Sequence, residues 1–115
     1  MPQPTLIKLH KQSNTLELHF DEGVRFKLAC EYLRVYTPSA ERTGHSAEQE
    51  ILVVGKKNVG ITAITPIGQY AVQLHFTDGH DSGFFSWDYL FTLGNEYDSR
   101  WQTYLDKLQQ ANASR

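Results

Sequence analysis

The chain has 115 residues, which suffice for one hydrophobic core but not for two independent ones. Apolar residues make up 40% and charged residues 21%, a composition typical of folded proteins and not of disordered ones. The formal net charge of −2 argues against a dedicated nucleic-acid binder, and the single cysteine, Cys30, excludes an internal disulfide. We therefore expect a single domain over residues 1–115, with its core at about 5–110.

Alternation of apolar and polar residues predicts three strands near the start of the chain. Residues 7–10 and 16–20 alternate on either side of a polar turn, which is typical of a hairpin, and residues 24–28 alternate after a second turn. The spacing then changes, and residues 29–35 fit one or two turns of helix. Residues 37–50 are small and polar, so we expect a long loop there.

Further strands are predicted in the middle of the chain, over residues 51–54, 59–66 and 68–76. The pair Asp78-Gly79 is typical of a tight hairpin turn, and a return strand is expected over residues 82–85.

Helices are predicted at the end of the chain. Ser86 is expected to cap a short helix that Gly94 ends, and Asn95 to cap a last helix. The apolar stripe of that last helix runs from Tyr97 to Leu108, and the polar tail 111–115 is expected to fray. Together these elements predict an α+β fold: a mostly antiparallel β-sheet of about six or seven short strands, a short central helix and one or two C-terminal helices.

The sequence has no apolar run of the length that a signal peptide or a transmembrane helix requires. Its longest uninterrupted run is residues 51–54. We therefore expect a cytoplasmic protein that has no membrane partner.

Candidate chemical groups gather at the Asp-Gly turn. Asp78, His80 and Asp81 are close in sequence, and a carboxylate beside an imidazole can orient it, raise its basicity or join it as a metal ligand. The same residues also suit a hairpin turn, which is the more common reason for such a cluster. His45 in the long loop is a further candidate. The other histidines are expected at solvent-facing positions of strands: His10, His19 and His75.

Motifs for nucleophilic catalysis or a phosphate-binding loop are missing from the sequence. Cys30 follows apolar residues and is expected to be a small buried hydrophobe. No serine stands in a Gly-x-Ser-x-Gly elbow. A phosphate-binding loop that ended at Gly55-Lys56 would need glycine where Glu50 stands, and Ser or Thr in place of Lys57.

Three stretches of the sequence carry a family resemblance: EYLRVYTPSAE at 31–41, GQYAV at 68–72 and DGHDSGFFSWDYL at 78–90, continued by LG at 93–94. They resemble the gamma-butyrobetaine hydroxylase-like N-terminal domain family over about residues 5–94. In that family the domain precedes gamma-butyrobetaine and trimethyllysine dioxygenases, is added to P-loop ATPases that handle iron–sulfur clusters, or stands alone in bacteria, as this chain is expected to do. The oxygenase iron site belongs to a separate domain, so the resemblance implies no hydroxylase activity here.

The resemblance also implies a lost zinc site. Metal-binding members use three cysteines and the histidine of the Asp-Gly-His turn, whereas the matching positions here are Thr37, Ser39, Arg42 and His80. Hydroxyls are poor zinc ligands, and Arg42 brings a positive charge where a thiolate would sit. We expect no metal and no cofactor. Instead, Thr37 and Ser39 can bond backbone amides, and Arg42 can pair with Asp78, Asp81 or Glu41.

These observations favour a non-catalytic accessory or binding module with a protein partner, which the resemblance associates with iron–sulfur protein metabolism. Two alternatives stay open. A small enzyme would use His80 and Asp81, with or without His45, as acid–base groups. A protein-interaction domain would dock through an aromatic surface near Phe84 and Phe85. The candidate binding residues are His80, Asp78, Asp81, His45, Arg42 and Arg34.

Overall fold

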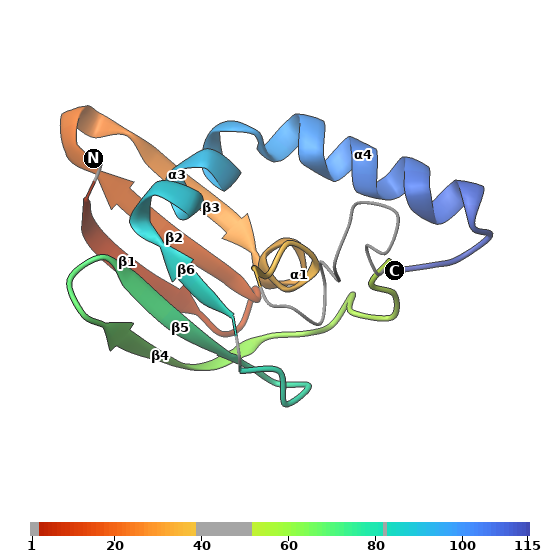
Figure 1. Cartoon of the computed structure of the whole chain (residues 1–115), viewed down its shortest axis with the longest axis horizontal. Coiled ribbons are helices and arrows are strands. Elements are labelled where there is room, and N and C mark those ends of the chain that lie inside the picture. Colours follow the sequence, from red (N-terminus) through yellow and green to blue (C-terminus); the bar gives the residue numbers. More distant parts are fainter. Residues whose placement is uncertain (1–2, 39–51, 82) are drawn as a thin grey trace.

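The chain folds into two three-stranded antiparallel sheets with helices beside and between them (Figure 1). The computed structural model describes residues 3–38, 52–81 and 83–115. The first sheet has the order β1-β2-β3, and its strands are β1 (Pro4–His10), β2 (Thr15–Phe20) and β3 (Arg25–Ala29). The second has the order β4-β5-β6, and its strands are β4 (Ile61–Ile67), β5 (Ala71–Phe76) and β6 (Phe84–Ser86). The predicted α+β fold with short antiparallel strands is confirmed, although the strands form two sheets and not one.

Strand β2 shows how the sequence pattern sets the inner face of the first sheet. Leu16, Leu18 and Phe20 are buried, while Glu17 and His19 between them lie on the outer face. The short 3-10 turn η1 (Asp21–Gly23) then leads into β3, which pairs antiparallel with β2. The predicted hairpin and third strand are therefore confirmed.

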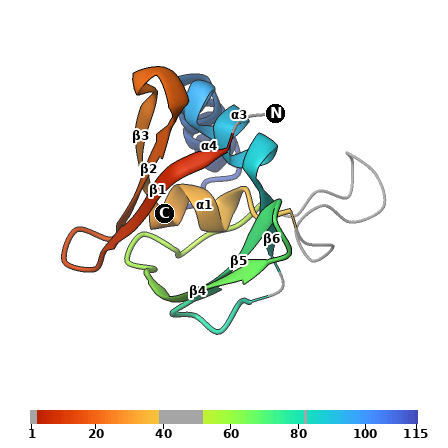
Figure 2. The ribbon, with the colours of Figure 1, turned by 90° about the vertical axis from the view of Figure 1, so that its left-hand side faces the viewer.

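Helix α1 (Cys30–Val35) lies between the two sheets (Figures 1 and 2). This central position explains why a helix of only six residues buries five of them. Cys30 is fully buried, as predicted, and burial raises the pKa of its thiol to about 11. A thiol with so high a pKa is almost entirely protonated near neutral pH and is a poor nucleophile.

Two helices follow β6: α3 (Trp87–Asn95) and α4 (Tyr97–Gln110). The predicted cap of the first is confirmed, since Ser86 Oγ accepts a hydrogen bond from the Tyr89 N–H at 3.1 Å. Two other predictions are wrong. Gly94 lies inside α3, where a Cβ would stand only 2.4 Å from the ring of Phe26, so packing explains this glycine. Asn95 does not cap α4, because α3 continues through Asn95.

The segment before β4 differs from the prediction. Residues 52–54 form no strand, and Ile51 lies outside the described residues. The Val53 carbonyl instead accepts a hydrogen bond from the Tyr104 hydroxyl at 2.6 Å, which ties this segment to α4. Tyr104 and Leu108 are the buried residues of that helix and belong to its predicted apolar stripe.

Aromatic rings fill one end of the core. Phe20, Phe26 and Phe91 pack edge to face, with ring centroids 5.2–5.9 Å apart. In the described part of the chain, no helix has both the length and the apolarity to cross a membrane.

Candidate functional site

The Asp-Gly-His turn follows β5 and is a tight, hydrogen-bonded turn, as the sequence predicts. The Gly79 N–H donates to the Phe76 carbonyl at 3.1 Å, and the Phe76 N–H donates to the His80 carbonyl at 3.0 Å. Asp78 Oδ1 accepts the His80 N–H at 3.1 Å, so this carboxylate also fixes the turn from within.

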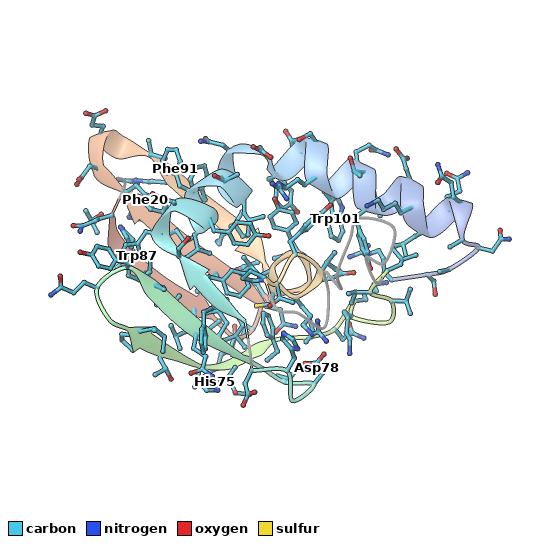
Figure 3. All side chains as sticks on the ribbon, in the orientation of Figure 1. Phe20, His75, Asp78, Trp87, Phe91 and Trp101 are labelled. Carbon is cyan, nitrogen blue, oxygen red and sulfur yellow. The ribbon has the colours of Figure 1, made fainter. Side chains whose placement is uncertain are left out.

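The other carboxylate oxygen of Asp78 is held by two cations. Arg34 Nε from α1 lies 2.9 Å from Asp78 Oδ2, and Lys56 Nζ lies 2.7 Å from the same atom. Figure 3 shows Asp78 at the end of β5, close to α1. The sequence singled out Arg34 but missed Lys56, although Lys56 and Lys57 are the only adjacent pair of lysines in the chain. Arg42, the partner suggested for Asp78, lies outside the described residues.

Opposing effects act on the pKa of Asp78. Burial is the largest single effect and raises this pKa, but the bonds from Lys56, from the His80 N–H and from Arg34 together outweigh it. The pKa falls to about 2, so Asp78 is ionised near neutral pH. A carboxylate held in this way serves better as an anchor for cations than as a general base.

His80 is buried, with 8% of its surface exposed. Its Nε2 lies 3.2 Å from Oγ1 of the fully buried Thr37. Gly83 packs against the same hydroxyl so closely that a Cβ there would stand 2.0 Å from Oγ1. The structure thus brings together two of the four positions matched to zinc ligands, while Ser39 and Arg42 lie outside the described residues.

The two described side chains at these positions do not form a zinc site by themselves. The neutral hydroxyl of Thr37 stands beside His80, and a neutral hydroxyl is a weak zinc ligand. In residues 3–38, 52–81 and 83–115, no group of three or more His, Cys, Asp or Glu side chains could hold a metal ion.

Asp81 and His45 are the remaining predicted residues of this cluster. Asp81 is exposed, and its backbone carbonyl accepts a hydrogen bond from Gln73 Nε2 at 2.6 Å. His45 lies outside the described residues. His80 therefore faces inward while its neighbour Asp81 faces solvent.

A pocket of about 350 Å³ lies next to Asp78. Its lining residues are Gly55, Lys56, Lys57, Asn58, Val59, Thr77, Asp78 and Arg115. We call the charged residues Arg34, Lys56, Lys57, Asp78 and Arg115 the basic corner. No motif in the sequence indicated this pocket, because it combines a turn, the end of β5 and the C-terminal tail.

The three histidines on strands belong to two different sheets. On the outer face of the first sheet, His10 and His19 each hydrogen-bond a different oxygen of Glu17 through Nε2. The bond from His10, followed by that from His19, lowers the pKa of Glu17 to about 2. His75 belongs to the second sheet, where its Nε2 lies 2.9 Å from Thr65 Oγ1 (Figure 3). All three lie on outward-facing strand positions, as predicted.

The fold and the site define a small α+β protein with two antiparallel sheets, a helix between them and a buried histidine in an Asp-Gly-His turn. Residues 7–91 match the model of a family described as gamma-butyrobetaine hydroxylase-like, N-terminal, and the chain belongs to this family.

Solved structures of similar chains share this fold. One NMR solution structure is 50% identical, has a TM-score of 0.85 and matches over 100% of this chain and 86% of its own. A second is 48% identical, with a TM-score of 0.88 and matches over 100% and 90%. A crystal structure from Acidithiobacillus ferrooxidans, of a protein of unknown function in the DUF971 family, is 38% identical, with a TM-score of 0.68 and matches over 80% of this chain and 92% of its own. No curated protein matches the chain.

Proposed function

We propose that the protein is a binding module that acts without catalysis and that binds its partner through the basic corner. The observation that supports this most is the pair of cations that bind Asp78. Arg34 and Lys56 share one carboxylate oxygen, which fixes both cations beside an open pocket. Lys57, which makes no ion pair with any described residue, also lines this pocket. Cations that are fixed before a ligand arrives lose little entropy on binding, so the arrangement suits recognition.

The geometry supports a binding role over the acid–base alternative. A general acid–base pair needs both groups within reach of one substrate atom. His80 is buried against Thr37, whereas Asp81 is exposed to solvent. Asp78 is ionised and engaged by two cations, so it is a weak base.

Affinity capture with matched variants tests the binding role. The double variant Lys56→Gln/Lys57→Gln removes two positive charges from the corner. The control Lys8→Gln/Lys27→Gln removes two from the outer face of the first sheet, where both residues lie opposite Glu17. A partner that the wild type and the control retain, and that the corner variant loses, is the expected result. Equal retention by both variants, with circular dichroism showing that both fold, would contradict the proposal.

The family resemblance extends this proposal to a protein partner in iron–sulfur protein metabolism, in the cytoplasm. Mass spectrometry of the captured proteins and cell fractionation test these two points. Proteins that carry or assemble iron–sulfur clusters are the expected partners. An unrelated partner that depends on the lysines would remove the iron–sulfur association and leave the binding role in place.

Docking through aromatic residues is a second candidate function, favoured by one exposed ring on β6 and another in the turn between β4 and β5. Phe84 is 54% exposed and Tyr70 is 59% exposed, whereas Phe85 is fully buried. The variant Phe84→Ser removes an exposed ring without opening the core. Loss of the captured partner in this variant, with retention in the lysine variant, would favour docking on the second sheet over binding at the basic corner.

A further inference from the structure

We propose that the basic corner binds a phosphate dianion carried by a small phosphorylated molecule. This inference rests on the proposed binding function and adds to its protein partner a small-molecule ligand at the same corner. Within the described residues, four cations and two anions either line the pocket or pair with a residue that lines it. The cations are Arg34, Lys56, Lys57 and Arg115, and the anions are Asp78 and Glu31. Among these side chains the cations therefore outnumber the anions, on a chain whose formal net charge is −2.

Asp78 repels an anion less than its place in the pocket suggests. Its Oδ2 is engaged by Arg34 and Lys56, and its Oδ1 accepts the His80 N–H. The carboxylate thus holds the ammonium of Lys56 in the pocket wall. A lysine ammonium has three N–H donors, so Lys56 can bind Asp78 and an anion together.

Arg115 is fixed at the pocket in a similar way. Its Nε and Nη2 donate to the carboxylate of Glu31, a side chain that is only 4% exposed. Its guanidinium carbon also lies 5.2 Å from the centre of the Trp101 ring. The Arg115 side chain is nevertheless 41% exposed, so its Nη1 remains available to a ligand.

Lys57 and the backbone of its turn supply the remaining donors. Lys57 is exposed and makes no ion pair within the part of the chain that the structure describes. The turn is closed by the Val59 N–H, which donates to the Lys56 carbonyl at 3.0 Å. Among the described residues, the N–H groups of Lys57 and Asn58 have no backbone acceptor. Backbone N–H groups beside lysines form a common setting for phosphate oxygens.

The charge and the size of the pocket favour a phosphate ester over a simple carboxylate. A phosphate monoester carries up to two negative charges near neutral pH and offers three acceptor oxygens. It therefore offers more negative charge and more acceptor oxygens to Lys56, Lys57 and Arg115 than one carboxylate does. A volume of about 350 Å³ also exceeds what a phosphate group fills, which leaves room for the molecule that carries it.

Titration followed by ¹⁵N NMR tests the inference. The probes are inorganic phosphate, glycerol 3-phosphate and acetate, each added at constant ionic strength and about pH 7.5. We expect saturable shifts at the amides of residues 55–59 and 77–78 with both phosphates, tighter for the ester, and binding of acetate that is weaker by about ten-fold. The variant Lys57→Gln should weaken phosphate binding by about five-fold, and the control Lys27→Gln should leave it unchanged.

Other outcomes separate this inference from the proposed function. Shifts spread over all exposed lysines, or equal weakening by Lys57→Gln and Lys27→Gln, would reduce the effect to ionic screening and overturn the inference. If no phosphate binds but the double lysine variant still loses its captured partner, the phosphate assignment fails and the binding function stands. If that variant keeps its partner while phosphate binds in the expected way, the proposed partner interface fails instead.

Discussion

Arg115 forms a two-pronged ion pair with the buried carboxylate of Glu31, although 84 residues separate them in the chain. Its Nη2 lies 2.7 Å from Oε1, and its Nε lies 3.1 Å from Oε2. Glu31 stands in the first turn of α1, so the pair ties the C-terminal tail to the helix between the sheets. The Ala113 N–H also holds this tail, because it donates to the Leu108 carbonyl at 2.9 Å. The sequence alone predicts that the tail frays.

Removal of Arg115 should therefore destabilise the fold. The variant Arg115→Ala leaves the carboxylate of Glu31 buried without its cation, and we expect the free energy of unfolding to fall by about 2 kcal/mol. Urea denaturation followed by tryptophan fluorescence measures this change. The control Arg25→Ala removes an exposed arginine from β3 and should change stability by less than about 0.5 kcal/mol. Adding Glu31→Gln to Arg115→Ala should recover part of the loss, and no recovery would contradict this account.

Asp78 should make stability depend on pH in the acid range. Because its pKa is lowered from 3.8 to about 2, its stabilising effect is full above about pH 4 and is lost as the pH falls through about 2. The variant Asp78→Asn should lower the free energy of unfolding by about 1 kcal/mol near neutral pH, a value reduced by solvent screening, and by less at about pH 2. Urea denaturation at both pH values checks this. The control Asp81→Asn changes an exposed carboxylate and should have little effect at either pH.

Local patterns in the sequence predicted the elements of the fold better than the contacts between them. Alternation marked the strands of the first sheet, and the Asp-Gly pair marked the turn, because each depends on neighbouring residues. The bond between Arg34 and Asp78 joins residues 44 positions apart, and the bond between Tyr104 and Val53 joins residues 51 apart. No local spacing encodes such pairs. The apolar run before β4 predicts a strand by its composition alone, whereas its hydrogen-bond partner in the structure is Tyr104 of α4.

Close packing around Thr37 gives a third test of the site. A Cβ at position 83 would collide with Thr37 Oγ1 and would lie 3.1 Å from the ring of Phe85. The variant Gly83→Ala should therefore lower the free energy of unfolding by about 2 kcal/mol or more. In the background Thr37→Ala, which lacks the hydroxyl, the same change should cost clearly less. Thermal or urea unfolding of the four proteins gives the coupling between the two positions, and additive effects would contradict the close contact.

Metal removal should leave the protein unchanged. The group beside His80 Nε2 is the neutral hydroxyl of Thr37, which is a weak zinc ligand. We expect the same melting temperature after dialysis against EDTA and after addition of a stoichiometric amount of zinc. Metal analysis of the purified protein provides an independent check. Zinc retained at one ion per chain through purification would show that residues outside those described complete a site.

The carboxylate of Glu17 offers a test on the opposite side of the molecule. His10 and His19 each donate to one of its oxygens or share a proton with it, so ionised Glu17 is favoured on this sheet face. Its pKa is lowered from 4.5 to about 2, and the stabilisation is therefore present above about pH 4.5 and lost as the pH falls through about 2. ¹³C NMR of the side-chain carboxyl should show a midpoint near 2, and Glu17→Gln should flatten the acid limb of the stability curve. A midpoint near 4.5 would mean that the two histidines do not hold the carboxylate in solution. Because Glu17 lies on the first sheet and Asp78 lies in the turn after β5, the effects of Glu17→Gln and Asp78→Asn should add.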